Sequence, residues 1–226
     1  MKIAIHQPNY FPWSGYFAKL LASDVFVFLD DVQYIKDGYI QRTRIRGGDE
    51  AKWLSCSVKR PSSKSMISEV IHTQDSWVDS HVSVLTQQYS ETPFFKEVME
   101  VLLDEREELT SESLAVTNRV LVRRVVDYLE LERQFVCSSD LEVEGKSSER
   151  LVNIVKSLGG KEYLSGKGAE AYMDYSLFTA ADLKVTTLEY RPITYEQRGL
   201  PWLPGLSILD VLFNLGKDSR KVLCYQ

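Results

Sequence analysis

The sequence predicts an α/β fold: a mostly parallel sheet with a Rossmann-like β-α-β start, a β-hairpin and a helical insertion. Two apolar runs of strand length, residues 2–6 and 24–29, flank a segment over 13–22 whose apolar residues recur at helical spacing. The second run is almost continuously apolar, as expected for a strand buried on both faces of a parallel sheet. Parallel strands need a crossover connection, so these segments predict one β-α-β unit.

The segments that follow predict first a hairpin and then helices. Residues 38–46 and 52–59 alternate in polarity on either side of Gly47-Gly48-Asp49, which is typical of a β-hairpin, and residues 70–73 are a further candidate strand. Apolar residues at three- and four-residue spacing then predict three helices, over 75–90, 92–108 and 111–131.

The last third of the chain returns to alternating strands and helices. Strands are predicted over 134–137, 162–164 and 184–190, and helices over 147–158 and 207–215. A purely helical segment therefore interrupts an α/β pattern. We expect one domain in three parts: an N-terminal α/β half over 1–74 that carries the site loops, a helical insertion over 75–131, and a C-terminal half over 132–226.

Composition limits the classes of partner. The 226 residues carry a net charge of −5, so we expect neither a basic field for nucleic acid nor attraction to anionic membranes. No apolar run approaches 18 residues and the N-terminus lacks a signal-peptide pattern, which predicts a cytoplasmic protein without membrane insertion. The three cysteines are far apart and are interpreted as reduced thiols. Whether the protein forms a homo-oligomer stays open.

Polar and aromatic residues gather where the first two strands end. Residues 6–12 follow the first strand and residues 30–34 the second, and neighbouring parallel strands would bring both groups to one crevice. The alternative is an ordinary turn, with Pro8 and Pro12 as turn formers and Asp30 as a cap. As a site, the crevice would take its substrate contacts from Gln7, Asn9, Tyr10, Trp13, Gln33 and Tyr34.

Three residues at this edge are candidate catalysts. Asp30 and Asp31 are expected to lie close to His6, where a carboxylate would fix the tautomer of the imidazole and raise its pKa. Such a histidine suits general acid–base catalysis, whereas a lone histidine at a strand end is more often only hydrogen-bonded structure. We assign no metal site, although Mg²⁺ carried with a nucleotide would suit the carboxylates.

Two segments are candidates for binding phosphate. Ser14 and Gly15 would stand at a helix N-terminus, where free N–H groups and the helix dipole favour an anion. Ser165, Gly166 and Lys167 follow a predicted strand in a glycine-rich turn that permits close backbone approach and adds a positive charge. The alternative for the turn is an ordinary loop.

Two further groups could complete the binding site. Arg42 and Arg44 are two residues apart on a strand, hence on one face, and could hold a diphosphate or a carboxylate; the alternative is a solvated strand face. A second group near the C-terminus could form an aromatic and polar wall for a sugar ring beside Trp202, or could serve as helix cap and dipole partner. Its members are Tyr195, Gln197, Ser207 and Asp210.

These residues also carry a family resemblance. The chain resembles the WbqC-like family, bacterial proteins typically encoded among genes for surface polysaccharides such as O-antigen and for other specialised sugar pathways. One departure is Gln41, where the family pattern has an asparagine, and a ligand contact there could differ. The matching motifs are Ile5-His6-Gln7-Pro8-Asn9-Tyr10-Phe11-Pro12-Trp13, Gly15-Tyr16-Phe17, Phe28-Leu29-Asp30-Asp31-Val32-Gln33-Tyr34, Arg42-Thr43-Arg44-Ile45, Trp53-Leu54, Tyr163-Leu164-Ser165-Gly166, and Leu206-Ser207-Ile208-Leu209-Asp210-Val211-Leu212-Phe213-Asn214 with Gly216.

The opening β-α-β unit is also similar to the HxGH nucleotidyl-transfer folds, which include adenylyltransferases and pantothenate-forming amide ligases. Gly15 falls at the glycine of that motif, while Trp13 and Tyr16 replace its two histidines. Those histidines normally stabilise the transferring phosphate, so their loss argues against conventional adenylyl transfer.

Three functions are consistent with these patterns. The first, which the resemblance favours, is acyl or aminoacyl transfer that forms an amide on a nucleotide-activated amino sugar in polysaccharide biosynthesis. The second is ATP-dependent nucleotidyl transfer or amide ligation through an adenylate. The third is a non-catalytic binding or scaffold protein of a polysaccharide assembly complex. The ligand expected in the first two is a sugar nucleotide or a similar phosphorylated molecule, and the cofactor stays open between ATP with Mg²⁺ and an acyl donor.

Overall fold

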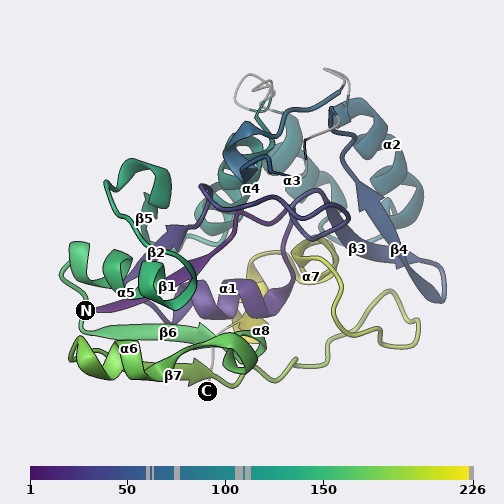
Figure 1. Cartoon of the computed structure of the whole chain (residues 1–226). Helices are drawn as coiled ribbons and strands as arrows, with labels where there is room; N and C mark the ends of the chain where they lie inside the picture. The colour runs from purple at the N-terminus through teal and green to yellow at the C-terminus, as the bar shows by residue number, and fades with distance from the viewer. Residues whose placement is uncertain (60–61, 63, 74–76, 105–108, 110–112, 224–226) are drawn as a thin grey trace.

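The structure is a computed structural model that describes residues 1–59, 62, 64–73, 77–104, 109 and 113–223. Its centre is a five-stranded sheet in which every neighbouring pair is parallel (Figure 1). The α/β fold, the parallel sheet and the pairing of the first two strands are therefore confirmed. Across the sheet the order is β5 (Gln134–Cys137), β2 (Val25–Phe28), β1 (Lys2–His6), β6 (Glu162–Gly166) and β7 (Lys184–Leu188).

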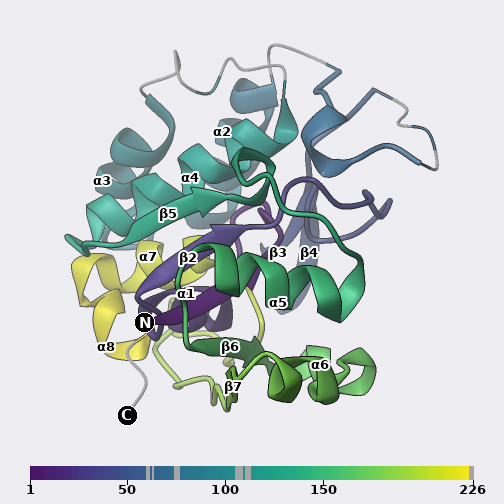
Figure 2. The same cartoon turned by 60° about the vertical axis from the view of Figure 1, so that its left-hand side comes forward.

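Helices cover both faces of this sheet because successive residues of its buried strands point in opposite directions. Phe26 and Phe28 pack into the larger core, on the face of α1 (Ser14–Leu21), α7 (Ile208–Leu215) and α8 (Arg220–Leu223). Val25 and Val27 pack into a second core beneath α5 (Ser147–Ser157) and α6 (Tyr175–Ala180). The two helical layers stand on opposite sides of the sheet in Figure 2.

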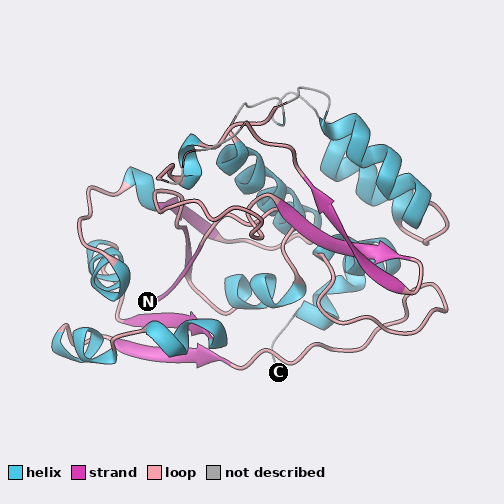
Figure 3. Cartoon of the chain, turned by 45° about the vertical axis from the view of Figure 1, so that its right-hand side comes forward, coloured by secondary structure: helices cyan, strands magenta, loops and turns pink. Residues whose placement is uncertain are grey.

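The hairpin and the middle helices form the far end of the molecule. The antiparallel pair β3 (Arg42–Gly47) and β4 (Glu50–Ser55) lies apart from the main sheet, beside α2 (Trp77–Tyr89) (Figure 3). The predicted helical segment over 75–131 also contains α3 (Phe95–Met99), a π-helical turn over Glu100–Asp104, and α4 (Leu114–Tyr128). Apolar residues from these helices share the larger core with α1 and α7.

Some predicted boundaries differ from the structure for local reasons. The hairpin begins at Arg42 rather than at residue 38, because residues 38–41 form a turn. Residues 70–73 form only isolated bridges, from Ile71 to Ser113 and from His72 to Val58, and so do not make a strand. The expected helix starts and ends at 75–76, 105–108 and 111–112 lie outside the described residues.

Strands β1 and β6 are paired over only part of their length. Strand β1 pairs with β2 as far as His6 opposite Phe28, but its pairing with β6 ends two residues earlier, at Ala4 opposite Leu164. Strand β6 meanwhile stays paired with β7 up to Gly166. The carboxyl ends of the two central strands therefore separate, at the topological switch point where open α/β sheets bind ligands. No helix in the described part of the chain is long and apolar enough to span a membrane.

Candidate functional site

A cleft of about 460 Å³ opens where β1 and β6 separate. Its walls come from the end of β1, the first two turns of α1, the segment after β6 and the segment after β7. This is the edge of the sheet that the sequence predicts as the site. The lining residues are His6, Trp13, Gly15, Tyr16, Lys19, Gly166, Lys167, Gly168, Leu188, Glu189, Tyr190 and Arg191.

His6 stands at the cleft as predicted, but its electrostatic environment differs from the prediction. The ring lies edge-on to Tyr16, and Nδ1 is 3.2 Å from the carbonyl oxygen of Gln7. Burial, with a smaller contribution from the nearby Lys19, lowers the pKa of His6 to about 3. The expected rise in this pKa is therefore wrong, and at neutral pH the imidazole is an uncharged hydrogen-bonding group.

The two aspartates are held by arginines, and neither is among the groups that shift the pKa of His6. Asp30 is 1% exposed and accepts from Arg119 at 2.5 Å, and its carboxylate also accepts from the backbone N–H of Ser139 at 3.1 Å. Asp31 pairs with Arg150 and accepts from the hydroxyl of Ser138 at 2.6 Å. The two ion pairs tie the loop after β2 to α4 and α5, and the hydrogen bonds from the serines tie it to the segment after β5. A catalytic role for either aspartate stays a prediction.

Lys19 is a residue of the cleft that the sequence analysis missed. It lies on the buried side of α1 and is only 5% exposed, and Nζ donates to the carbonyl oxygen of Ile5 at 2.8 Å. Nζ also lies 5.8 Å from the centroid of the Tyr163 ring. Burial lowers the pKa of Lys19 to about 7. The available signal was its spacing of three residues from Tyr16, which places a lysine on the apolar stripe of the helix.

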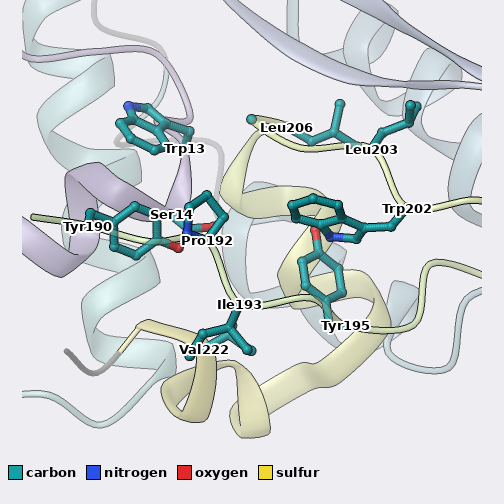
Figure 4. A pocket seen from close by; sticks show the side chains of 11 residues that line it. Trp13, Ser14, Tyr190, Pro192, Ile193, Tyr195, Trp202, Leu203, Leu206 and Val222 are labelled. Carbon is teal, nitrogen blue, oxygen red and sulfur yellow. The ribbon is translucent and has the colours of Figure 1, made fainter. Parts of the chain in front are cut away.

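An aromatic pair covers the first turn of α1. Trp13 packs edge-on against Tyr190, with ring centroids 5.4 Å apart, and Tyr190 is hydrogen-bonded to the side chain of Ser14. A Cβ atom on Gly15 would lie 2.3 Å from the Trp13 indole, so only glycine lets the indole lie across this turn. Trp13 and Tyr190 thus form one wall of the cleft, and they also line a smaller neighbouring cavity, where Figure 4 shows them.

Only part of the predicted phosphate-binding turn lines the cleft, and the rest is buried. Gly166 and Lys167 line the cleft, and Lys167 is exposed at the start of a 3₁₀ helix over Lys167–Tyr172. A Cβ on Gly166 or Gly168 would meet nothing within 4 Å, so packing does not require these glycines and the backbone is open to the cleft. Ser165 is fully buried and is not among the lining residues.

The residues predicted as a sugar-binding wall form a buried polar network instead. Asp210 is fully buried and accepts from Tyr195 at 2.7 Å, from Tyr89 at 3.0 Å and from the amide nitrogen of Gln197 at 3.0 Å. Arg46 donates to the amide oxygen of Gln197 at 2.5 Å. Burial raises the pKa of Asp210, which these donors and the Arg46 charge partly offset. The network joins the hairpin, α2, α7 and the C-terminal segment 195–203.

The space beside this network is small. Tyr195 and Trp202 face a cavity of about 20 Å³, drawn in Figure 4, which can hold about one water molecule. The contact of Tyr195 and Trp202 with a sugar ring stays a prediction. Ser207 caps α7, as its sequence position also allowed: its hydroxyl accepts from the N–H of Leu209 at 3.2 Å and donates to the carbonyl oxygen of Phe11 at 2.8 Å.

The remaining predicted contacts lie outside the cleft lining. Arg42 stacks on Trp53 at 4.1 Å, and the backbone carbonyl of Arg44 accepts from the N–H of Ser207 at 2.7 Å. Tyr10 is fully buried, and its hydroxyl is 2.5 Å from Nδ1 of His81.

Four other predicted contacts also serve the local structure. Asn9 and Tyr34 are buried. Gln33 forms a backbone bridge with Met66, and the carbonyl oxygen of Gln7 accepts from Tyr16 at 3.2 Å. The substrate-binding roles of all these residues stay predictions.

The cysteines have surroundings typical of unreactive thiols. Cys56 and Cys137 are free and buried, and burial raises the pKa of Cys56 to about 12. Cys224 lies outside the described residues. Within the described ranges, no three histidine, cysteine, aspartate or glutamate side chains gather as a metal site would require.

The fold and the cleft define an open α/β protein with a candidate ligand site at the switch point of its sheet. The sequence model of the WbqC-like protein family matches residues 7–222, so the chain belongs to the WbqC-like family. The chain is also similar to uncharacterized protein Rv1507c of Mycobacterium tuberculosis (strain ATCC 25618 / H37Rv), at 31% identity over 226 residues, which cover 99% of this chain and 98% of that protein. No solved structure matches the chain.

Proposed function

We propose that this protein is an enzyme of bacterial surface-polysaccharide or specialised sugar biosynthesis that forms an amide on the amino group of a nucleotide-activated sugar. The observation that supports this most directly is the cleft at the switch point. It combines three basic side chains, Lys19, Lys167 and Arg191, with an aromatic wall of Trp13 and Tyr190. The cytoplasmic location expected from the sequence is part of the same proposal.

Each part of the cleft suits one part of such a substrate. The exposed Lys167 and Arg191 stand at the mouth, where they attract a diphosphate, while Glu189 beside them favours an uncharged or cationic neighbour. Aromatic faces pack against the C–H groups of a sugar ring, and Trp13 is 37% exposed. The neutral His6 can hydrogen-bond a hydroxyl or amino group without repelling a cation.

The chemistry requires only an amine and an activated acyl donor. The neutral amino nitrogen of the sugar attacks the carbonyl carbon of the donor, the amide C–N bond forms, and the bond from the carbonyl carbon to sulfur or phosphate oxygen breaks. The proton lost by the nitrogen balances the thiolate or phosphate that departs. The cleft would contribute mainly by holding both reactants in position, which can supply several orders of magnitude in rate.

A turnover assay tests this function. UDP- and dTDP-linked amino sugars are incubated with acyl-CoA donors, and products are detected by the mass added to the sugar nucleotide. We expect an acylated product, a kcat at least 10-fold lower for His6→Ala, and a raised KM for Lys167→Met. Lys161→Met is the matched control, because Lys161 precedes β6 at its opposite end. Unchanged sugar nucleotides with every donor, or full activity of His6→Ala, would contradict the proposal.

One observation favours a second candidate, an ATP-dependent ligase that works through an adenylate. The glycine-lysine turn after β6 lines the same cleft as Trp13 and Tyr16, which occupy the positions of the HxGH histidines. This route predicts that ATP and Mg²⁺ bind and that pyrophosphate is released together with AMP. Pyrophosphate formation that depends on an added carboxylic acid would favour the ligase, and acylation without ATP would favour the transferase. A well-folded protein that binds none of these molecules would favour a scaffold.

A further inference from the structure

The gap between β1 and β6 contains a backbone acceptor that the sheet leaves without a strand partner. Pairing between these strands ends at Ala4, while the carbonyl oxygen of His6 faces β2 and accepts from the N–H of Leu29 at 2.8 Å. Because carbonyls alternate in direction along a strand, that of Ile5 faces the gap. Its partner is Nζ of Lys19 at 2.8 Å. An amine therefore lies where the two central strands separate.

Among the described residues, the surroundings of Lys19 provide basic and hydrogen-bonding groups but no carboxylate paired with it. Among the described residues Lys19 makes no ion pair, and one of the three donor positions of its ammonium is used, by Ile5. His6 is close enough for Lys19 to lower its pKa, and the ring centroid of Tyr163 is 5.8 Å from Nζ. Lys167 and Arg191 stand at the mouth of the same cleft, and Glu189, the one carboxylate among its described lining residues, is exposed. A buried amine with this neighbourhood lacks a counter-ion.

We propose that the gap is a phosphoryl subsite, in which an anionic oxygen of a diphosphate binds Nζ of Lys19, and that this amine takes up a proton when the diphosphate binds. The inference rests on the proposed function, because it places the diphosphate of the sugar nucleotide in the cleft. Binding of the anion supplies the counter-ion that the folded protein lacks and favours the charged form of the lysine. Lys167 and Arg191 would hold the outer oxygens.

The direction in which the ligand affinity changes with pH follows from the proton that is taken up on binding. In the free protein the pKa of Lys19 is about 7, so at pH 8 most molecules carry a neutral amine. An adjacent anion raises this pKa, so the complex holds a proton that the free protein lacks, and affinity is highest below pH 7 and falls above it. The other titratable or charged groups that face the lysine or the cleft are His6, Tyr16, Tyr163, Lys167, Glu189 and Arg191.

Calorimetry with a non-reacting probe measures this proton directly. UDP-glucose and dTDP-glucose carry the diphosphate but no amino group, and the diphosphate diester does not titrate near pH 8. Binding heats at pH 8 in buffers of different ionisation enthalpy give the number of protons taken up. We expect between about 0.5 and 1 proton per ligand for the natural protein, and an affinity that falls by up to about tenfold per pH unit above pH 7.

Two substitutions assign that proton to Lys19. Lys19→Arg keeps a charged donor that does not titrate, so it should bind the probe with no proton uptake. Lys19→Met should weaken binding by about 10- to 100-fold and also abolish the uptake. Lys167→Met should weaken binding while leaving the uptake unchanged, since it leaves Lys19 in place. Circular dichroism verifies that each variant is folded.

Each outcome decides the proposal. Proton uptake that persists in Lys19→Arg would assign the proton to another group, such as His6, and would overturn it. Binding of the probes without uptake, or no binding at millimolar concentration, would overturn it too. If nucleotide-linked amino sugars are nevertheless acylated in the turnover assay, the proposed function stands and only the role of Lys19 fails. If the calorimetry shows no proton uptake through Lys19 and the turnover assay gives no acylated product, the proposed function is contradicted as well.

Discussion

Arg46→Met is expected to lower the free energy of unfolding by about 3–5 kcal/mol, because it removes a buried side chain that donates three hydrogen bonds and whose charge favours the buried Asp210 carboxylate. Arg46 is 2% exposed, and its guanidinium donates to the carbonyl oxygens of Gly48 at 2.9 Å and Pro201 at 2.6 Å as well as to Gln197. Its positive charge also partly offsets the burial of Asp210. Loss of the arginine would release the segment 195–203 from the hairpin.

Chemical denaturation at pH 7 measures this loss, and Arg44→Met is the matched control. Arg44 lies two residues earlier on β3 and is partly exposed, and its backbone rather than its side chain bonds Ser207. We expect the control to change the free energy of unfolding by no more than about 1 kcal/mol. Equal, small losses for the two variants would show that the buried network does not stabilise the fold as described.

Lys19→Met is expected to change how stability depends on pH. The folded-state pKa of Lys19 is about 7, below its ordinary value of 10.5, so between these values the unfolded chain binds a proton that the folded protein does not. Stability therefore rises with pH across this window and loses that contribution as pH falls through 7. The rise amounts to about 3 kcal/mol between pH 7 and 9.5, and Lys19→Met should lack it.

The measurement is the difference in free energy of unfolding between the variant and the natural protein at several pH values. We expect that the methionine variant is favoured most at pH 7 and that its advantage shrinks by about 3 kcal/mol by pH 9.5. Because other buried titratable groups, such as Tyr16, are present in both proteins, their contributions cancel when the two free energies of unfolding are subtracted. Lys161→Met, at an exposed position, should give a curve parallel to that of the natural protein. A parallel curve for Lys19→Met would contradict an uncharged Lys19.

Local patterns were sufficient to predict the sheet and the edge at which its cleft opens. Residues 2–6 and 24–29 carry the apolar signal of buried strands, and the polar residues that follow had to lie at one end of neighbouring parallel strands. The glycine-lysine turn at 166–168 was found for the same reason: it follows a strand. Its part in the cleft comes from the placement of β6 beside β1, which the chain order did not give.

The electrostatics of the site could not be predicted, because the partners come from distant segments. Asp30 is paired with an arginine 89 residues away, and Asp31 with one 119 residues away. Asp210 is bonded to Tyr89 across 121 residues. Sequence spacing gives no information about such pairs, so carboxylates that looked available for catalysis are held in ion pairs. Lys19 was missed because a lysine usually has an exposed side chain, even where its neighbours at helical spacing are apolar.

The most direct test of the cleft as a sugar-nucleotide site is the dissociation constant of UDP- and dTDP-linked amino sugars, measured by calorimetry for the natural protein, Lys167→Met and Lys161→Met. The two lysines stand at opposite ends of β6. A ligand site in the cleft predicts binding by the natural protein, about tenfold weaker binding by Lys167→Met, and unchanged binding by Lys161→Met. Absence of binding, or equal affinities for the two variants, would contradict a site at this end of the sheet.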